Sequence, residues 1–168
     1  MEQTTGFWTV GLIVKKILAV KLSAVAENVR GSPGMRTGGC QCGEVRYEST
    51  GEPRALYVCH CRECQRQSAS AFGMSLEVPR AGLRVTKGVP HYWTRGTDSG
   101  GRLRCAFCPT CGTRLWHEPE EESDTVTIKA GSLDEPVDVS TAIHIWTSRK
   151  LPGMAIPSGP RQFPKEPD

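Results

Sequence analysis

The stretch "TGGCQCGEVRYES", residues 37–49, places two cysteines one residue apart among three glycines and then begins an alternating run. A disulfide between Cys40 and Cys42 would close a very small, strained ring, and disulfide geometry tolerates little distortion. Zinc instead holds thiolate sulfurs about 2.3 Å from the metal, hence roughly 3.8 Å from each other. Residues i and i+2 of a straight strand lie about 6.6 Å apart, so the chain must bend here. The glycines that supply this freedom are Gly38, Gly39 and Gly43.

The remaining cysteines extend this interpretation to two metal centres. Spacings of one or two residues are typical of metal ligands, because disulfide frameworks usually scatter their cysteines across loops. "FCPTCG", residues 107–112, has the spacing of a zinc knuckle, and "CHCREC", residues 59–64, offers three thiols that leave one corner of a tetrahedron open. Eight thiols exceed one tetrahedral site and predict two zinc ions, although spacing alone does not divide them. The three clusters are Cys40 and Cys42; Cys59, Cys61 and Cys64; and Cys105, Cys108 and Cys111.

The formal net charge of the 168-residue chain is +3. Eight zinc-bound thiolates and two zinc ions would lower this by about four, so the metal-loaded chain would be weakly acidic. A nucleic-acid partner is therefore not expected, because phosphate binding is carried mainly by Lys and Arg.

The N-terminal residues 1–34 form a separate segment. Its apolar stretch at 6–26 is interrupted by Lys15, Lys16 and Lys21, so no run approaches the roughly 20 residues of a membrane span. It also lacks the basic region that precedes the apolar core of a signal peptide. We expect a poorly ordered leader over 1–34, a zinc domain over 35–165, no membrane partner and a cytoplasmic location.

Beyond Met35 the pattern predicts a mainly β domain. Short runs alternate apolar and polar residues and are separated by glycine and proline. The segment "CQRQSASAF", residues 64–72, favours a short helix, and the proline-rich tail at 151–168 should lack regular structure. The expected strands contain residues 45–47, 55–59, 74–78, 83–85, 91–94, 103–107, 113–117, 126–128 and 141–147.

Five segments in order, "GGCQCGEVRY", "CHCRECQRQS", "FCPTCGTRLW", "AGSLDEP" and "HIWTSRKLP", resemble the glutathione-dependent formaldehyde-activating enzyme family, which also includes centromere protein V. The resemblance covers about residues 36–165 and implies a β-tent fold with two zinc ions. It implies a structural zinc on Cys40, Cys42, Cys108 and Cys111, and a catalytic zinc on Cys59, Cys61 and Cys64. Two departures from the family are Ser68–Ala69–Ser70, where a glycine is frequent, and Gly153, where many relatives have tryptophan.

Several further residues have two interpretations. Cys105 either completes the second zinc site as a fourth ligand or is an ordinary buried thiol. His60 lies between two ligands, so a position beside the ligands or at the surface is favoured over coordination. We expect the other histidines, His91, His117 and His144, to be packed or solvent-facing. Trp93, Trp116 and Trp146 should serve the core, one of them lining a pocket, and the acidic run at 118–124 should be a solvated loop.

The resemblance implies a zinc-dependent carbon–sulfur lyase that acts on a thiol adduct, with glutathione and formaldehyde as the expected small molecules. The alternative is a non-catalytic zinc module that binds a protein or chromatin, as the centromere relative suggests. The near-neutral charge and the lack of a basic tail disfavour this alternative. Thiol redox exchange through Cys61 and Cys64 would require both thiols to be free of metal.

Overall fold

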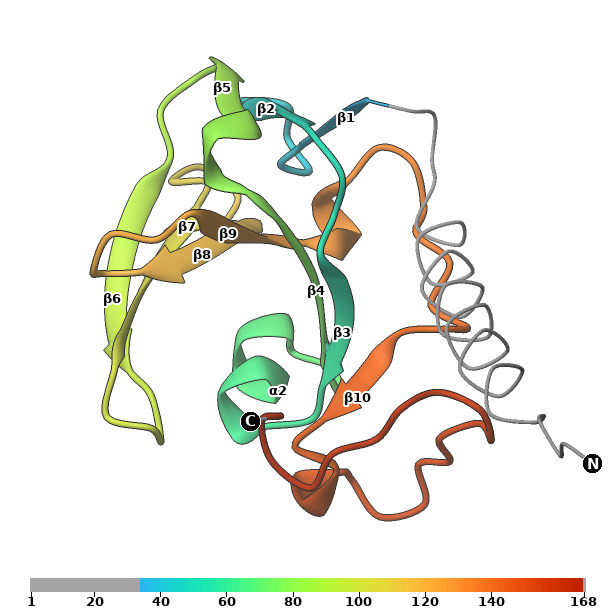
Figure 1. The fold of residues 1–168 in the computed structure, drawn as a ribbon. Coiled ribbons are helices and arrows are strands. Elements are labelled where there is room, and N and C mark those ends of the chain that lie inside the picture. Colours follow the sequence, from blue (N-terminus) through green and yellow to red (C-terminus); the bar gives the residue numbers. More distant parts are fainter. Residues whose placement is uncertain (1–33, 168) are drawn as a thin grey trace, which may run out of the picture. The chain divides into compact units, whose positions relative to one another are not determined.

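The computed structural model describes residues 34–167, whose strands form two sheets (Figure 1). The leader expected over 1–34 lies, apart from Gly34, outside the described residues. A three-stranded antiparallel sheet has the order β1-β2-β5, with β1 at Met35–Gly39, β2 at Arg46–Thr50 and β5 at Leu83–Lys87.

The second sheet has seven strands in the order β10-β3-β4-β9-β8-β7-β6. Its neighbouring strands are antiparallel except for the parallel pair of β10 and β3. These strands are β3 (Ala55–Cys59), β4 (Gly73–Pro79), β6 (His91–Gly96), β7 (Arg102–Phe107), β8 (Arg114–Pro119), β9 (Thr125–Lys129) and β10 (Ile143–Ile145). Helix α2 spans Arg62–Ser68, and three short 3-10 helices are η1 (Arg80–Gly82), η2 (Ala130–Ser132) and η3 (Thr147–Arg149).

The mainly β prediction is confirmed, and each expected run overlaps a strand. Two elements differ from expectation: one strand was not predicted, and the helix begins earlier than predicted. Strand β1, "MRTGG", lacks the apolar alternation by which a strand is recognised. It forms by antiparallel pairing with β2, in which Met35 lies opposite Thr50 and Gly39 lies opposite Arg46. Helix α2 begins at Arg62, before Cys64, because the Cys61 sulfur accepts a hydrogen bond from the Cys64 backbone N–H and caps the helix.

The apolar core lies between the two sheets. Side chains alternate between the two faces of a strand, and one face of β3, β4 and β9 carries residues that are at most 6% exposed: Leu56, Val58, Leu76, Val78, Val126 and Ile128. Trp116 of β8 lies opposite Ile128 and extends this row. Tyr47 of the three-stranded sheet packs edge-on against Trp116, with ring centroids 5.8 Å apart. The other face of the seven-stranded sheet therefore remains available for polar residues.

The glycines of β1 are needed for a reason other than the bend predicted from sequence. Neither has a positive φ angle. A Cβ atom on Gly38 would lie 2.4 Å from the Tyr47 hydroxyl, and one on Gly39 would lie 2.5 Å from the Val45 carbonyl oxygen. These positions therefore permit close packing of β1 against its surroundings, whereas Gly43, with a φ of +74°, makes the turn.

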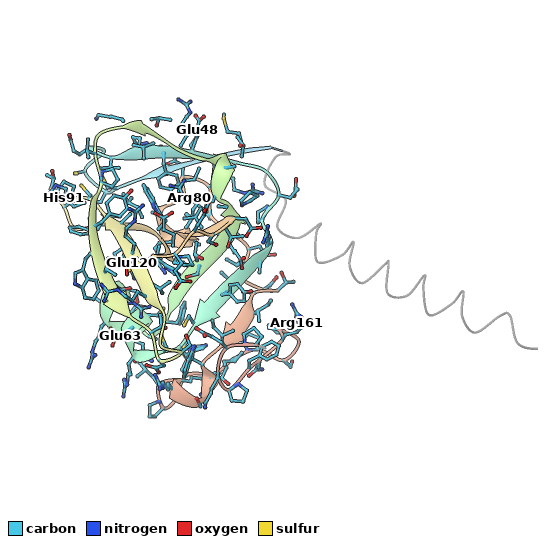
Figure 2. The ribbon with its side chains drawn as sticks, turned by 60° about the vertical axis from the view of Figure 1, so that its left-hand side comes forward. Glu48, Glu63, Arg80, His91, Glu120 and Arg161 are labelled. Carbon is cyan, nitrogen blue, oxygen red and sulfur yellow. The ribbon has the colours of Figure 1, made fainter. Side chains whose placement is uncertain are left out.

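Two predictions about single residues are wrong. Trp93 is 53% exposed on the edge strand β6, whereas Trp116 is buried in the core. Glu118 belongs to β8 and is buried, because Arg80 and Arg104 bind its carboxylate at 2.6 and 2.5 Å. Arg80 and Glu120 are labelled in Figure 2.

The tail is irregular, as expected, and packs on β10 and η3. The Trp146 and Thr147 backbone N–H groups donate to the carbonyls of Lys165 and Phe163 at 3.2 and 3.1 Å. Within the described residues, no helix has the length and apolar character needed to cross a bilayer.

Candidate functional site

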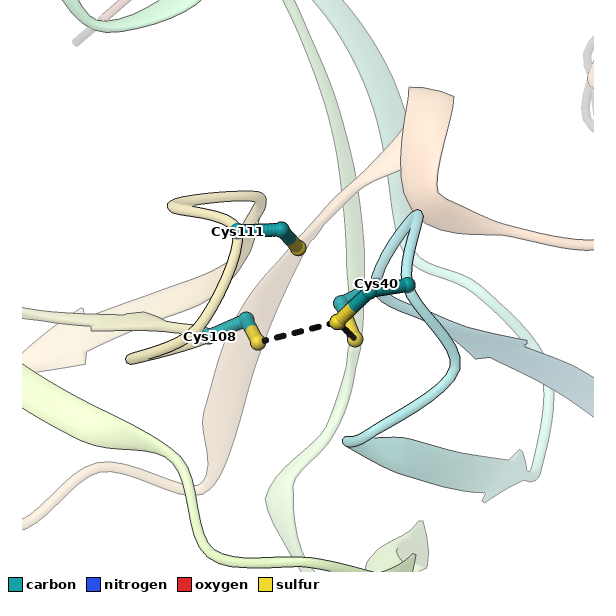
Figure 3. Close-up of side chains that lie close together, drawn as sticks. Cys40, Cys108 and Cys111 are labelled. Carbon is teal, nitrogen blue, oxygen red and sulfur yellow. Dashed lines mark hydrogen bonds between the residues drawn. The ribbon is translucent and has the colours of Figure 1, made fainter.

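The first thiol group joins the two sheets. Its four sulfurs, from Cys40, Cys42, Cys108 and Cys111, lie within 4.8 Å of one another. Figure 3 shows the labelled members converging from two turns. Cys40 and Cys42 lie in the β1–β2 turn, and Cys108 and Cys111 in the β7–β8 turn. The group therefore ties the start of the domain to its middle.

Both turns have the same backbone construction. The Gly43 N–H donates to the Cys40 carbonyl at 3.1 Å, and the Gly112 N–H donates to the Cys108 carbonyl at 2.9 Å. Their φ angles of +74° and +72° favour glycine. The Val45 N–H also donates to the Cys40 sulfur at 3.2 Å. Such bonds stabilise the thiolate form that a metal requires.

Thr113 supports the same group from the β7–β8 turn. Its hydroxyl oxygen lies 3.2 Å from the Cys111 sulfur and accepts a hydrogen bond from the Gln41 N–H at 3.2 Å. Hydrogen bonding by Thr113 lowers the pKa of the Cys111 thiol to about 5. Cys111, one of the two exposed members of the group, therefore favours the thiolate form at neutral pH.

The second thiol group lies where β3 meets α2. Cys59 ends β3, Cys61 caps α2 and Cys64 lies in its first turn, and their sulfurs are within 4.8 Å of one another. Hydrogen bonds with the Cys59 and Cys64 thiols lower the pKa of Cys61. In Figure 1, α2 and the three-stranded sheet lie at opposite ends of β4, and in Figure 2 Glu63 of α2 is likewise far from Glu48 of β2. The two groups are therefore separate.

Cys105 lies outside both groups of thiols formed by the described residues. Its buried sulfur accepts a hydrogen bond from Gln67 Nε2 at 3.7 Å and lies 3.9 Å from the Leu103 carbonyl oxygen. It is on the same face of the seven-stranded sheet as His117, its partner across β7 and β8. Its role as a fourth ligand stays a prediction.

A cavity of about 320 Å³ opens beside the second group. Cys59, Cys61 and Cys64 line it, whereas no cysteine of the four-thiol group does. Its volume is in the range of small-molecule sites. The tail contributes Glu166 and Pro167 to its wall. The other lining residues are Tyr57, Ser75, Arg95, Leu103, His117, Thr127, Ile145 and Trp146.

Side chains of the strands alternate between the core face and the cavity face of the sheet, and the cavity face carries the polar ones. The register places Ser75 opposite Lys129, Thr127 opposite His117 and Cys105 opposite Trp93. The buried Lys129 ammonium donates to the Ser75 hydroxyl at 3.1 Å, and burial lowers the pKa of Lys129 to about 8.

Sequence reasoning missed most of these polar residues. In "TVTIK", residues 125–129, it recognised only the apolar alternation. The intervening Thr127 and Lys129 were the available signal, but alternation does not say which polar face lines a cavity. Trp146 lines the cavity, which confirms the prediction that one of three tryptophans lies at a pocket.

The four histidines occupy different environments. His60 is fully buried, and its Nε2 lies 3.0 Å from Nδ1 of His144. The second thiol group does not include His60, although Cys59 and Cys61 flank it in the sequence, as expected for a residue that is not a ligand. His91 is exposed. His117 lines the cavity, and its buried Nδ1 has no hydrogen-bond partner. Burial, followed by the charges of Lys129, Arg114 and Arg95, lowers the pKa of His117 well below its usual value.

Both thiol groups fit zinc. The Cys40–Cys42 and Cys42–Cys108 sulfur distances are 3.5 and 3.7 Å, near the roughly 3.8 Å expected for two thiolates on one tetrahedral zinc. Four thiols form a closed set, which is typical of structural zinc, whereas three leave a position for a further ligand. Cysteine thiolates are the ligands that zinc prefers in such sites.

Two comparisons with known proteins were made. One solved structure similar to this chain is that of a Rhodobacter sphaeroides protein, with 23% sequence identity, a TM-score of 0.47, and coverage of 58% of this chain and 87% of that chain. The family model described as "Glutathione-dependent formaldehyde-activating enzyme" matches residues 35–149, which include both thiol groups. The chain therefore belongs to the glutathione-dependent formaldehyde-activating enzyme family.

Proposed function

We propose that the chain is a zinc-dependent carbon–sulfur lyase acting on a thiol adduct, with glutathione and formaldehyde as its small molecules. One observation carries this proposal: the three-thiol group lines the cavity, and the four-thiol group does not. A zinc site with three protein ligands and an accessible fourth position is the catalytic arrangement. The proposal assigns the catalytic zinc to Cys59, Cys61 and Cys64, the structural zinc to the other group, and a cytoplasmic location to the protein.

The reaction forms one sulfur–carbon bond, converts the C=O double bond to a single bond and transfers one proton. The thiol sulfur bonds to the aldehyde carbon, and the thiol proton ends on the former carbonyl oxygen as a hydroxyl; the reverse reaction breaks the same sulfur–carbon bond. A bound zinc ion would supply Lewis acidity or stabilise the thiolate.

The cavity residues supply the other functions. His117 Nδ1 is buried, has no partner and belongs to a side chain that lines the cavity. Because the lowered pKa keeps the imidazole neutral at pH 7, Nδ1 can accept a hydrogen bond from the thiol and guide its proton towards the oxygen. Trp146 and Ile145 give part of the wall an apolar surface that limits the access of water.

The test measures adduct formation between glutathione and formaldehyde by NMR exchange, against the uncatalysed rate. Wild type should accelerate the reaction. Cys61→Ala should abolish the acceleration, and His117→Gln should lower it by about 10²-fold. Glu120→Gln is the control, because Glu120 pairs with Arg102 outside the cavity. Wild-type protein with two zinc ions and no acceleration would refute the glutathione assignment. A fully active Cys61→Ala would move the catalytic role elsewhere.

A further inference from the structure

Three cations gather on the cavity face beside the three-thiol group. Arg95 of β6 lines the cavity, and Lys129 ends β9 on the same face. A register shift in β8 places Arg114 opposite Phe107, so it shares the face of His117 and Cys105. All three charges also act on His117, because each of them lowers the pKa of its imidazole. Three strands therefore direct positive charge to one place.

None of these cations has a carboxylate partner within the part of the chain that the structure describes. The ion pairs there involve other arginines. Arg95 donates from Nη1 to the carbonyl of its own neighbour Gly96 at 2.9 Å, while its buried Nε has no partner. Nη2 of Arg114 is also buried without one. Unpaired buried donors are costly, so such a cluster is expected where a ligand completes it.

The thiols do not neutralise this charge. Three thiolates on one zinc ion carry a net charge of about −1, against three cations. Glu166 is the single carboxylate among the described residues that line the cavity, and it belongs to the tail. A positive charge is left even when Glu166 is included. The surplus favours a ligand that carries its own negative charge.

We propose that Arg95, supported by Arg114 and Lys129, forms an anion subsite that selects thiols carrying a carboxylate over neutral thiols. Arg95 is the specificity-determining residue, because its side chain is the one of the three that lines the cavity. Its guanidinium can bind a carboxylate through two parallel hydrogen bonds. This inference rests on the proposed function for thiol binding at the three-cysteine site, but it is independent of the identity of the aldehyde and of turnover.

The experiment uses isothermal titration of the zinc-loaded protein with 3-mercaptopropionate and with the neutral 2-mercaptoethanol. Wild type should bind the carboxylate thiol about tenfold more tightly. Arg95→Gln should reduce this ratio to about one, and Arg95→Lys should retain part of it. Arg102→Gln should leave the ratio unchanged, because Arg102 lies on the same hairpin and pairs with Glu120. An equal ratio in wild type and Arg95→Gln, or no preference in wild type, would overturn the inference.

A second measurement needs no variant. Propionate should raise the apparent Kd of wild type for 3-mercaptopropionate, and propionamide should not; competition by neither would also overturn the inference. These binding measurements test the anion subsite independently of the proposed lyase reaction. Loss of selectivity in Arg95→Gln, together with no acceleration of the glutathione reaction, would retain the anion subsite and reject the reaction.

Discussion

Cys42 Sγ lies 3.7 Å from Cys108 Sγ, although 66 positions separate the two residues in the chain. This contact joins a turn of the three-stranded sheet to a turn of the seven-stranded sheet. A metal ion bound there would cross-link both sheets, whereas one bound by the three-thiol group would join only the end of β3 to α2.

Loss of one cysteine should therefore affect folding and zinc content differently in the two thiol groups. Cys108→Ala removes a ligand from the group whose metal-binding energy is largely folding energy, so we expect unfolded or insoluble protein. Cys61→Ala should remain folded and keep about one zinc ion of two. Glu120→Gln is the control and should keep both, because Glu120 pairs with Arg102 and belongs to neither thiol group. Elemental analysis and circular dichroism are the measurements.

Identical unfolding of Cys61→Ala and Cys108→Ala would make both sites structural and favour the non-catalytic zinc module. One zinc equivalent or fewer in wild type, with disulfides found by mass spectrometry, would contradict the metal assignment altogether.

The buried carboxylate of Glu118 should contribute more to the free energy of unfolding than the exposed carboxylate of Glu120 does. Glu118→Gln leaves an amide between Arg80 and Arg104, which bind the carboxylate at 2.6 and 2.5 Å. We expect a loss of about 1–2 kcal/mol in the free energy of unfolding, because both arginines are partly solvated. Glu120→Gln should cost less than about 0.5 kcal/mol, since Glu120 and Arg102 are exposed. Urea denaturation of both variants compares them; equal losses would refute this ranking.

The buried Tyr47 hydroxyl links β2 of the three-stranded sheet to η2, which follows β9. Its oxygen lies 2.7 Å from the Ser132 hydroxyl oxygen, and burial raises the pKa of Tyr47 to about 12. Tyr47→Phe should lower the free energy of unfolding at pH 7 by about 1 kcal/mol. Tyr92→Phe is the control and should change it by less than about 0.5 kcal/mol, because Tyr92 is 43% exposed.

The same tyrosine predicts a dependence on alkaline pH. The folded-state pKa exceeds the ordinary value of 10, so the neutral phenol is favoured in the folded protein. Its contribution to stability is present below about pH 10 and is lost as the pH rises towards 12. The stability of wild type relative to Tyr47→Phe should fall by about 1 kcal/mol between pH 10 and 11. An unchanged difference over that interval would contradict the burial of the phenol.

Helix α2 should become more stable when its C-cap residue, Ala69, is replaced by glycine. Ala69 has a φ of 48° at the helix C-cap, a left-handed conformation that costs non-glycine residues about 1 kcal/mol. Ala69→Gly should therefore raise the free energy of unfolding by about 0.5 kcal/mol, measured by thermal denaturation. Arg66→Gly, in the exposed part of the same helix, should lower it by about 1 kcal/mol. Destabilisation of both variants would show that the Ala69 conformation is not strained.

Much of the domain was predictable because its signals are local. Alternation in β4 and β9 reports one buried face, and the spacings around Cys40 and Cys108 report two half-sites with a glycine at the turn. β1 was missed because its glycines carry no such pattern. Glu118 was assigned to a loop because the partners that bury it, Arg80 and Arg104, come from two other segments.

The sequence by itself determined the strand runs, the thiol half-sites and the family of the protein. Only the tertiary structure decided which half-sites meet, because sulfurs 66 positions apart come together through the order of the strands. It alone also decided that Arg95 lines the cavity and that Lys129, opposite Ser75, lies on the same face of the sheet. Period-two alternation separates the two faces of a strand, but the role of each face depends on what packs against it. One face of the seven-stranded sheet is covered by Tyr47 and its neighbours, and the other carries the charges beside the three thiols.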